Sequence, residues 1–138
     1  MHDPDSVAAF EECSLPPAGL SHRAHVRLAW IYLREHPLPQ ALNRFSTGLK
    51  RYAASLGASA KYHETITWAY LFLVHQRIAI GPADETWQEF SVRNPDLMTW
   101  RPSILAGYYR DETLTSELAK RVFVLPDRSG PDPQPRNA

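Results

Sequence analysis

Between residues 21 and 80, apolar side chains recur every three or four positions, as they do along the buried face of an amphipathic helix. No stretch alternates apolar and polar residues between hairpin turn signals, which is the pattern typical of strands. The sequence therefore predicts an all-α protein. Because the first three helices are joined by short connections, we expect an antiparallel helical bundle of three longer helices, followed by two or three short C-terminal helices.

Capping residues and helix breakers mark where the predicted helices begin and end. Ser21 is a suitable N-cap for the first helix, Pro37 terminates that helix, and Gly57 is suited to end the second. Gly48 lies inside the second helix, where it costs about 1 kcal/mol relative to alanine, and it indicates a close helix crossing. The long helices are predicted at about 21–36, 39–56 and 60–80, and shorter ones at about 86–93, 102–109 and 115–122.

Proline-rich stretches border a single predicted helical domain at residues 21–125. Residues 1–20 form an N-terminal lead-in, in which we expect no long helix and which Phe10 and Leu15 could attach to the domain. Residues 126–138 are rich in proline and polar side chains, so we expect them to form a disordered tail.

The first helix carries histidines on the side that should be apolar. At about 100° per residue, the arginines at positions 23, 27 and 34 fall on the opposite side. A histidine facing water would cost nothing, so its place on the inner side needs a reason, and the pattern predicts a buried polar site. The inner face comprises His22, His25, Val26, Ala29, Leu33 and His36.

The third helix repeats this feature at its start. His63, Thr67 and Tyr70 share one face, and Glu64 lies beside them. If the three helices run up, down and up, the starts of the first and third helices lie at the same end of the bundle. We therefore expect the histidines of both helices, a carboxylate and a threonine hydroxyl to converge there.

One interpretation of this cluster is a divalent metal site. Side chains three positions apart on a helix are close enough for His22 and His25 to share one ion, and His63 would supply a third imidazole. Glu64 would be a further ligand or would orient one of the histidines. Zinc or iron(II) would suit these ligands, and the sequence does not distinguish them.

A second interpretation is acid–base chemistry without a metal, with His63 and Glu64 as the catalytic pair. Thr67, Tyr70 and Tyr109 would then contact a bound small molecule, the last as part of a lid. Either interpretation predicts a protein that binds a small molecule. If the protein is an enzyme, a hydrolase or a lyase is expected. The alternative is a non-enzymatic interaction module whose histidines are structural and whose exposed aromatic residues meet a partner protein.

Composition narrows the partners that can be expected. Fifteen basic and fifteen acidic side chains cancel, which argues against binding to nucleic acid or to an anionic membrane. The N-terminus lacks the pattern of a signal peptide, and the longest apolar run, residues 68–74, is too short to span a bilayer. The lone Cys13 cannot form an internal disulfide, and the reducing cytoplasm is the simplest environment for such a protein, so we expect it to be cytoplasmic. The sequence leaves open whether the chain forms a homo-oligomer.

Three segments carry a resemblance to known sequences: SHRAHVRLAWIYL at 21–33, KYHETIT at 61–67 and YYRDETLTSELAKRVFVLPD at 108–127. In these segments the chain resembles a group of small bacterial all-α proteins of unassigned function, over about residues 20–127. The resemblance implies a helical fold and transfers no activity. The chain is unlike hemerythrins and ferritin-like carboxylate proteins, which need Glu-x-x-His or longer histidine spacings.

Overall fold

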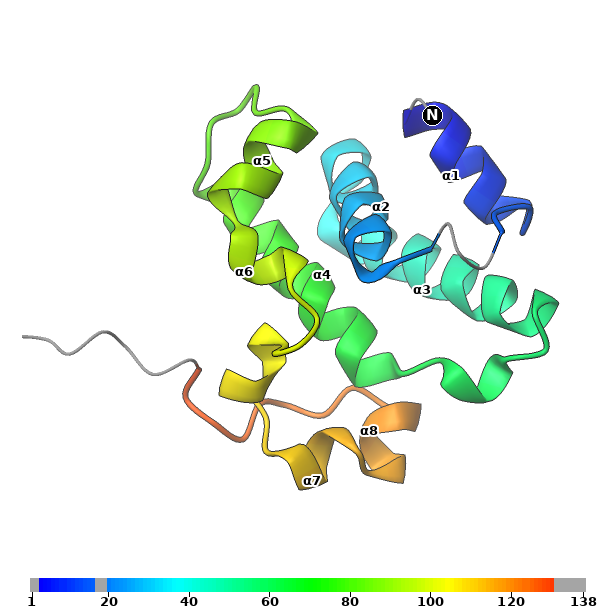
Figure 1. The fold of residues 1–138 in the computed structure, drawn as a ribbon, viewed down its shortest axis with the longest axis vertical. Coiled ribbons are helices and arrows are strands. Elements are labelled where there is room, and N and C mark those ends of the chain that lie inside the picture. Colours follow the sequence, from blue (N-terminus) through cyan, green and yellow to red (C-terminus); the bar gives the residue numbers. More distant parts are fainter. Residues whose placement is uncertain (1–2, 17–19, 131–138) are drawn as a thin grey trace, which may run out of the picture.

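All regular structure in the described part of the chain is helical. The computed structural model describes residues 3–16 and 20–130, and no strand occurs within these ranges. The predicted all-α class is therefore confirmed. In chain order the elements are α1 (Asp3–Glu11), α2 (His22–Glu35), α3 (Leu38–Ser55), the 3-10 helix η2 (Ser59–Lys61), α4 (Glu64–Ala79), α5 (Trp87–Arg93), α6 (Pro95–Met98), the 3-10 helix η3 (Ile104–Gly107), α7 (Asp111–Leu114) and α8 (Glu117–Arg121) (Figure 1).

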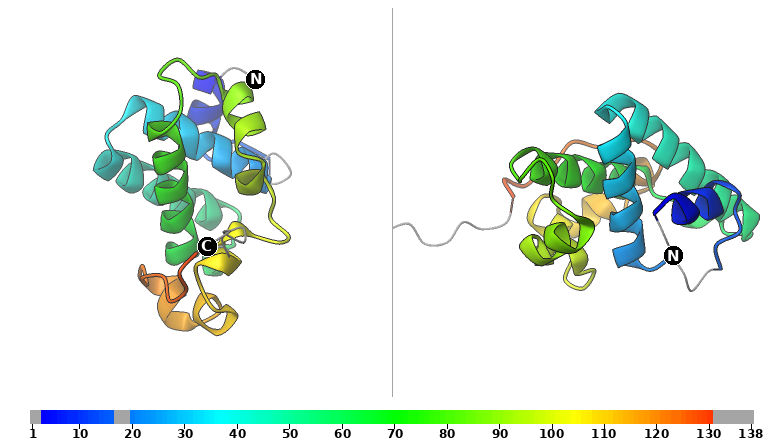
Figure 2. Two further views of the ribbon diagram at one scale, coloured as in Figure 1. Left: turned by 90° about the vertical axis from the view of Figure 1, so that its left-hand side faces the viewer. Right: turned by 90° about the horizontal axis from the view of Figure 1, so that it is seen from above.

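The three longest helices, α2, α3 and α4, pack against one another in every pairwise combination. The Ser21 hydroxyl accepts a hydrogen bond from the amide of Ala24 at 3.2 Å and so caps the start of α2, as predicted. From the short connection at Pro37, α2 and α3 diverge at an open angle (Figure 2). The three helices share one core, and the antiparallel order of the expected bundle stays a prediction.

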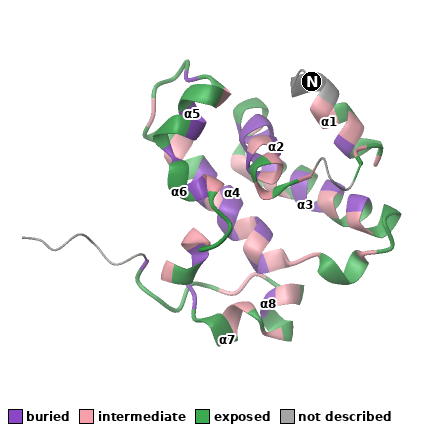
Figure 3. Cartoon of the chain, in the orientation of Figure 1, coloured by how far each residue is buried: buried purple, intermediate pink, exposed green. Residues whose placement is uncertain are grey.

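The second half of α2 is buried on nearly all sides. Every residue from Leu28 to Leu33 is buried, because α1, α3, α4 and α6 all contact this helix (Figure 3). The sequence pattern predicted a single inner face and left Trp30 and Ile31 outside it. Their burial follows from the short elements that pack against the far side of α2, which a one-sided periodicity does not reveal.

The N-terminal segment differs from the expectation, because it forms helix α1 where no long helix was predicted. Phe10 anchors this helix: its side chain is fully buried, with ring centroids 6.3 Å from Tyr32, 5.8 Å from Phe45 and 6.1 Å from Tyr52. A Cβ at Gly48 would lie 2.7 Å from the Phe10 ring. The close approach predicted at this glycine is therefore made by a side chain of α1.

The third long helix begins later than predicted. Gly57 ends the α3 region with φ of +66°, a left-handed conformation that glycine adopts without strain. The chain then forms the short η2 and starts α4 only at Glu64. Residues 60–63, which the sequence placed inside the helix, instead form the connection that leads His63 into its N-cap position.

The chain after α8 is bonded to α4. The fully buried Thr65 hydroxyl donates to the carbonyl of Val122 at 2.8 Å and accepts from the amide of Val124 at 3.0 Å. Asp127, which the sequence placed in the disordered tail, accepts hydrogen bonds from the Arg110 amide at 2.8 Å and from the Thr113 hydroxyl. The remainder of the predicted tail, 131–138, lies outside the described residues.

No helix within residues 3–16 and 20–130 combines the length and the apolar character that crossing a bilayer requires.

Candidate functional site: a cavity between α2, α3 and α4

A cavity of about 600 Å³ lies between the first turns of α2 and α4 and the second half of α3. Five of the residues singled out in the sequence line it: His22, His25, His63, Thr67 and Tyr70. The full lining is Leu20, His22, His25, Val26, Ala29, Phe45, Leu49, Tyr52, Ala53, Leu56, Ala58, Lys61, Tyr62, His63, Ile66, Thr67, Tyr70 and Trp100.

Helix α3 supplies the apolar wall of the cavity. Phe45, Leu49, Tyr52 and Leu56 follow one another at spacings of three and four residues, so they form one stripe along the helix. Val26 of α2 and other apolar side chains complete the wall. Such a surface excludes water and favours an apolar occupant, because each Å² of apolar surface removed from water contributes about 25 cal/mol.

The imidazole of His25 lines the cavity without a hydrogen-bonding partner among the described residues. Its ring makes no hydrogen bond to any residue within 3–16 and 20–130. Burial, reinforced by the neighbouring His22, lowers the pKa of His25 to about 4. The ring is therefore neutral at pH 7, with one nitrogen able to donate a hydrogen bond and the other able to accept one.

His22 is held by a backbone contact from another element. Its Nε2 lies 2.9 Å from the carbonyl oxygen of Leu97, so this nitrogen carries the proton and donates it. Its ring also packs edge-on against Tyr70, with ring centroids 4.9 Å apart, and lies 5.2 Å from the ring of Trp100. Burial lowers the pKa of His22, and the hydrogen bond to Leu97 opposes that shift only in part.

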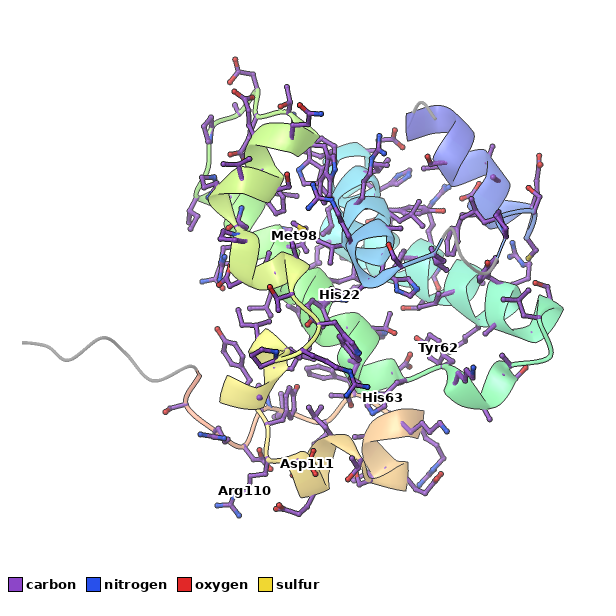
Figure 4. The ribbon with its side chains drawn as sticks, in the orientation of Figure 1. His22, Tyr62, His63, Met98, Arg110 and Asp111 are labelled. Carbon is purple, nitrogen blue, oxygen red and sulfur yellow. The ribbon has the colours of Figure 1, made fainter. Side chains whose placement is uncertain are left out.

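His63 acts as the N-cap of α4. Its Nδ1 accepts a hydrogen bond from the amide of Ile66 at 3.1 Å, and its Nε2 donates to the carbonyl of Leu114 at 2.7 Å. Both ring nitrogens are thus engaged with the backbone. The positions of His22, His63 and the neighbouring Tyr62 are marked in Figure 4.

The expected metal site at His22, His25 and His63 does not fit this geometry. A coordinating imidazole needs a free nitrogen lone pair, and the Nδ1 lone pair of His63 is already occupied by the Ile66 amide. Within residues 3–16 and 20–130, no group of three or more histidine, cysteine, aspartate or glutamate side chains is arranged to hold a metal ion. Zinc or iron binding by His22, His25 and His63 therefore stays a prediction, which the arrangement of the described residues does not support.

The predicted catalytic pair is also separated, because Glu64 does not line the cavity. Its carboxylate accepts a hydrogen bond from the Tyr62 hydroxyl at 2.5 Å and lies 3.9 Å from Nζ of Lys50. Burial and this hydrogen bond raise the pKa of Tyr62. His63 faces the cavity while Glu64 is engaged beside it, so no His–Glu hydrogen bond is formed.

The three predicted ligand-contacting residues fall in different places. Thr67 donates to the His63 carbonyl at 2.7 Å, and Tyr70 is 2.7 Å from the Ser103 hydroxyl; both line the cavity. Tyr109 does not. Its hydroxyl donates to the carbonyl of Val124 at 2.7 Å, and its ring borders a separate cavity of about 190 Å³. Burial raises the pKa of Tyr109 to about 12.

Several lining residues were missed by the sequence analysis. Phe45, Leu49 and Tyr52 recur at helical spacing in the predicted second helix, a pattern that packing in the core explains equally well. Trp100 comes from a connecting segment with no helical period, so the sequence does not indicate that it reaches this cavity. Lys61 was expected inside the predicted helix at 60–80 and instead ends η2.

No protein-family model, no curated protein and no solved structure matches this chain.

Proposed function

We propose that this chain binds a small, predominantly apolar molecule in the cavity between α2, α3 and α4. The observation that carries this proposal is the neutral, part-buried His25, which faces a cavity of about 600 Å³ without a hydrogen-bonding partner in the described chain. Ligand cavities are typically about 300–1,000 Å³ and combine an apolar lining with few polar groups.

The chemistry of the lining defines what the occupant should carry. An apolar body would cover the stripe of Phe45, Leu49 and Tyr52, and an uncharged hydrogen-bonding group such as a hydroxyl or carbonyl would meet His25. A ligand group that bonds to the His25 ring adds a hydrogen bond worth about 0.5–1.5 kcal/mol to the free energy gained from apolar burial.

Binding is favoured over catalysis by the hydrogen bonds of the predicted catalytic residues. His63 uses both ring nitrogens on backbone groups, and Glu64 accepts from Tyr62. A general base needs a free lone pair within reach of the substrate proton. Both nitrogens of His63 are engaged and Glu64 does not line the cavity, so the hydrolase and lyase interpretations draw no support from this arrangement.

The test is ligand-induced thermal stabilisation with small aromatic probes, namely indole, naphthalene and 2-naphthoate. A ligand present at ten times its dissociation constant adds about 1.4 kcal/mol to the free energy of unfolding. Ala53→Trp fills the cavity from α3, whereas Ala54→Trp adds the same ring one position along, on an exposed part of that helix.

We expect at least one probe to raise the melting temperature of the natural chain and of Ala54→Trp, but not that of Ala53→Trp. Equal stabilisation of both tryptophan variants would place binding elsewhere on the surface, and no stabilisation by any probe would contradict the proposal. A protein that binds no probe but associates with another chain would be the interaction module that the sequence left as the alternative.

A further inference from the structure

We infer that the preferred ligand is an apolar carboxylate, with its anionic group at Lys61 and its apolar body between α2, α3 and α4. This inference rests on the proposed function and adds to it the class of ligand. It follows from the charges around the cavity, from the exposure of its rim and from the two helix starts that border it.

Among the described residues, Lys61 is the only lysine or arginine that lines the cavity. No aspartate or glutamate is among the lining residues in the described chain, and Lys61 makes no ion pair there. Burial lowers the pKa of His22 and His25, so these two side chains add no charge at neutral pH. Lys61 therefore places a positive charge at the border of the cavity, and no lining carboxylate in the described chain opposes it.

The nearest carboxylate does not neutralise that charge. Glu64 lies three residues beyond Lys61, but its oxygen Oε1 is occupied by the Tyr62 hydroxyl at 2.5 Å and by Lys50 at 3.9 Å. Lys50 also lies over the Tyr62 ring, 5.1 Å from its centroid. These contacts tie Glu64 to Lys50, and they leave Lys61 available for an anion supplied by a ligand.

Two helix starts add to the positive potential of the cavity. His22 and His25 belong to the first turn of α2, and Ile66 and Thr67 belong to the first turn of α4. Partial positive charge gathers at helix N-termini and favours anions nearby. Both helices thus act in the same direction as Lys61.

The exposure of the lining places the anionic group at the rim and the apolar body inside. Lys61 and Leu56 are exposed, whereas Phe45 and Tyr52 are buried. A carboxylate at Lys61 would keep contact with water, so it would not incur the cost of burying a full charge. The remainder of the molecule would cover the apolar stripe of α3.

The test compares three probes that share one ring system: 2-naphthoate, 2-naphthylmethanol and 2-naphthylmethylamine. Isothermal titration calorimetry near neutral pH would measure their dissociation constants on the full chain. We expect 2-naphthoate to bind about three- to tenfold more tightly than the alcohol, since a partly exposed ion pair and two helix starts each contribute modestly. The amine should bind more weakly than the alcohol.

Charge variants locate the anionic group. Lys61→Gln should reduce the preference for 2-naphthoate over the alcohol to about twofold or less, and Lys61→Glu should reverse it toward the amine. Lys120→Gln is the matched control, because it removes the same charge from a lysine of α8 that does not line the cavity. It should leave the preference for 2-naphthoate unchanged.

The outcomes separate this inference from the proposed function. An alcohol that binds the natural chain as tightly as 2-naphthoate would overturn the carboxylate preference and leave the binding cavity intact. A preference that survives in Lys61→Gln would overturn the role of Lys61. If none of the three probes binds, the inference is wrong, and the proposed function is wrong as well only if indole and naphthalene also fail to stabilise the natural chain.

Discussion

The imidazole of His63 joins the carbonyl of Leu114 to the first turn of α4, across 51 positions of sequence. One nitrogen donates to Leu114 at 2.7 Å, and the other accepts from the Ile66 amide at 3.1 Å. A single neutral ring thus caps a helix and holds the end of α7 against it. This arrangement explains why an inward-facing histidine at the cavity need not be a metal ligand.

Replacing His63 should therefore affect folding before it affects binding. We expect His63→Ala to lower the free energy of unfolding by about 1–3 kcal/mol, because it removes a helix cap and leaves the Leu114 carbonyl without its donor. His63→Asn should recover about 1 kcal/mol, since asparagine is a good N-cap. Urea unfolding measures both values, and an unchanged stability of His63→Ala would refute the structural role.

Gly48 should resist substitution, although it lies inside a helix. Alanine would normally stabilise such a position by about 1 kcal/mol. Here the added Cβ would lie 2.7 Å from the ring of Phe10, which is buried among aromatic neighbours and cannot retreat freely. We expect Gly48→Ala to destabilise the protein and to loosen α1, as measured by chemical denaturation and by hydrogen exchange of the α1 amides.

The matched comparison for this prediction is Phe10→Ala. Removing a buried phenylalanine costs about 3–5 kcal/mol, but it also vacates the space that a residue 48 side chain needs. In a double-mutant cycle, Gly48→Ala should therefore become neutral or stabilising in the Phe10→Ala background. Additive effects of the two substitutions would show that this contact does not control the position of α1.

His25 should make the protein less stable in mild acid. Its pKa is about 4 in the folded chain and 6.5 in the absence of burial, so the unfolded chain takes up a proton that the folded chain resists. Stability should accordingly fall as the pH drops from 6.5 toward 4, by up to about 3 kcal/mol from this group. The lowered pKa of His22 acts in the same direction.

His25→Phe should remove most of that pH dependence, because it leaves a ring of similar shape that takes up no proton. Free energies of unfolding measured at several pH values across this range would show the change in slope. His75→Asn is the control, since His75 is an exposed side chain on α4. In this variant the free energy of unfolding should change with pH as it does in the natural chain. An unchanged slope in His25→Phe would contradict the burial of a neutral His25.

Thr65→Val should detach the segment that follows α8. The buried Thr65 hydroxyl is bonded to Val122 and to Val124, and valine would leave both backbone groups without that partner. We expect a loss of about 1–3 kcal/mol and faster proteolysis after residue 121. If Thr65→Val is cleaved no faster than the natural chain, other contacts hold this segment.

The inner faces of the long helices could be predicted from the sequence, because the spacing of apolar residues indicates which side of a helix faces inward. His22, His25, His63, Thr67 and Tyr70 were placed on inner faces from spacing alone, and all five line one cavity. Ser21 was also identified as the cap of α2 from its residue type. These features depend on interactions within a single helix or on one face of it.

The features that were missed depend on contacts between distant segments. Helix α1 is held by the packing of Phe10 against α2 and α3, which its own composition does not indicate. His63 was read as a metal ligand because its acceptor, Leu114, lies in another helix. Glu64 was read as catalytic because sequence spacing does not reveal that Tyr62 and Lys50 engage it.

Ligand binding by this chain is tested most directly by occupancy of the cavity between α2, α3 and α4. Nuclear Overhauser effects between the ring protons of 2-naphthoate and the side chains of the full-length protein would test it in one measurement. We predict contacts to Val26, Phe45 and Ile66, which belong to three different helices and line this cavity. Contacts confined to exposed side chains such as Leu118 and Leu125, or no contacts at all, would contradict the account.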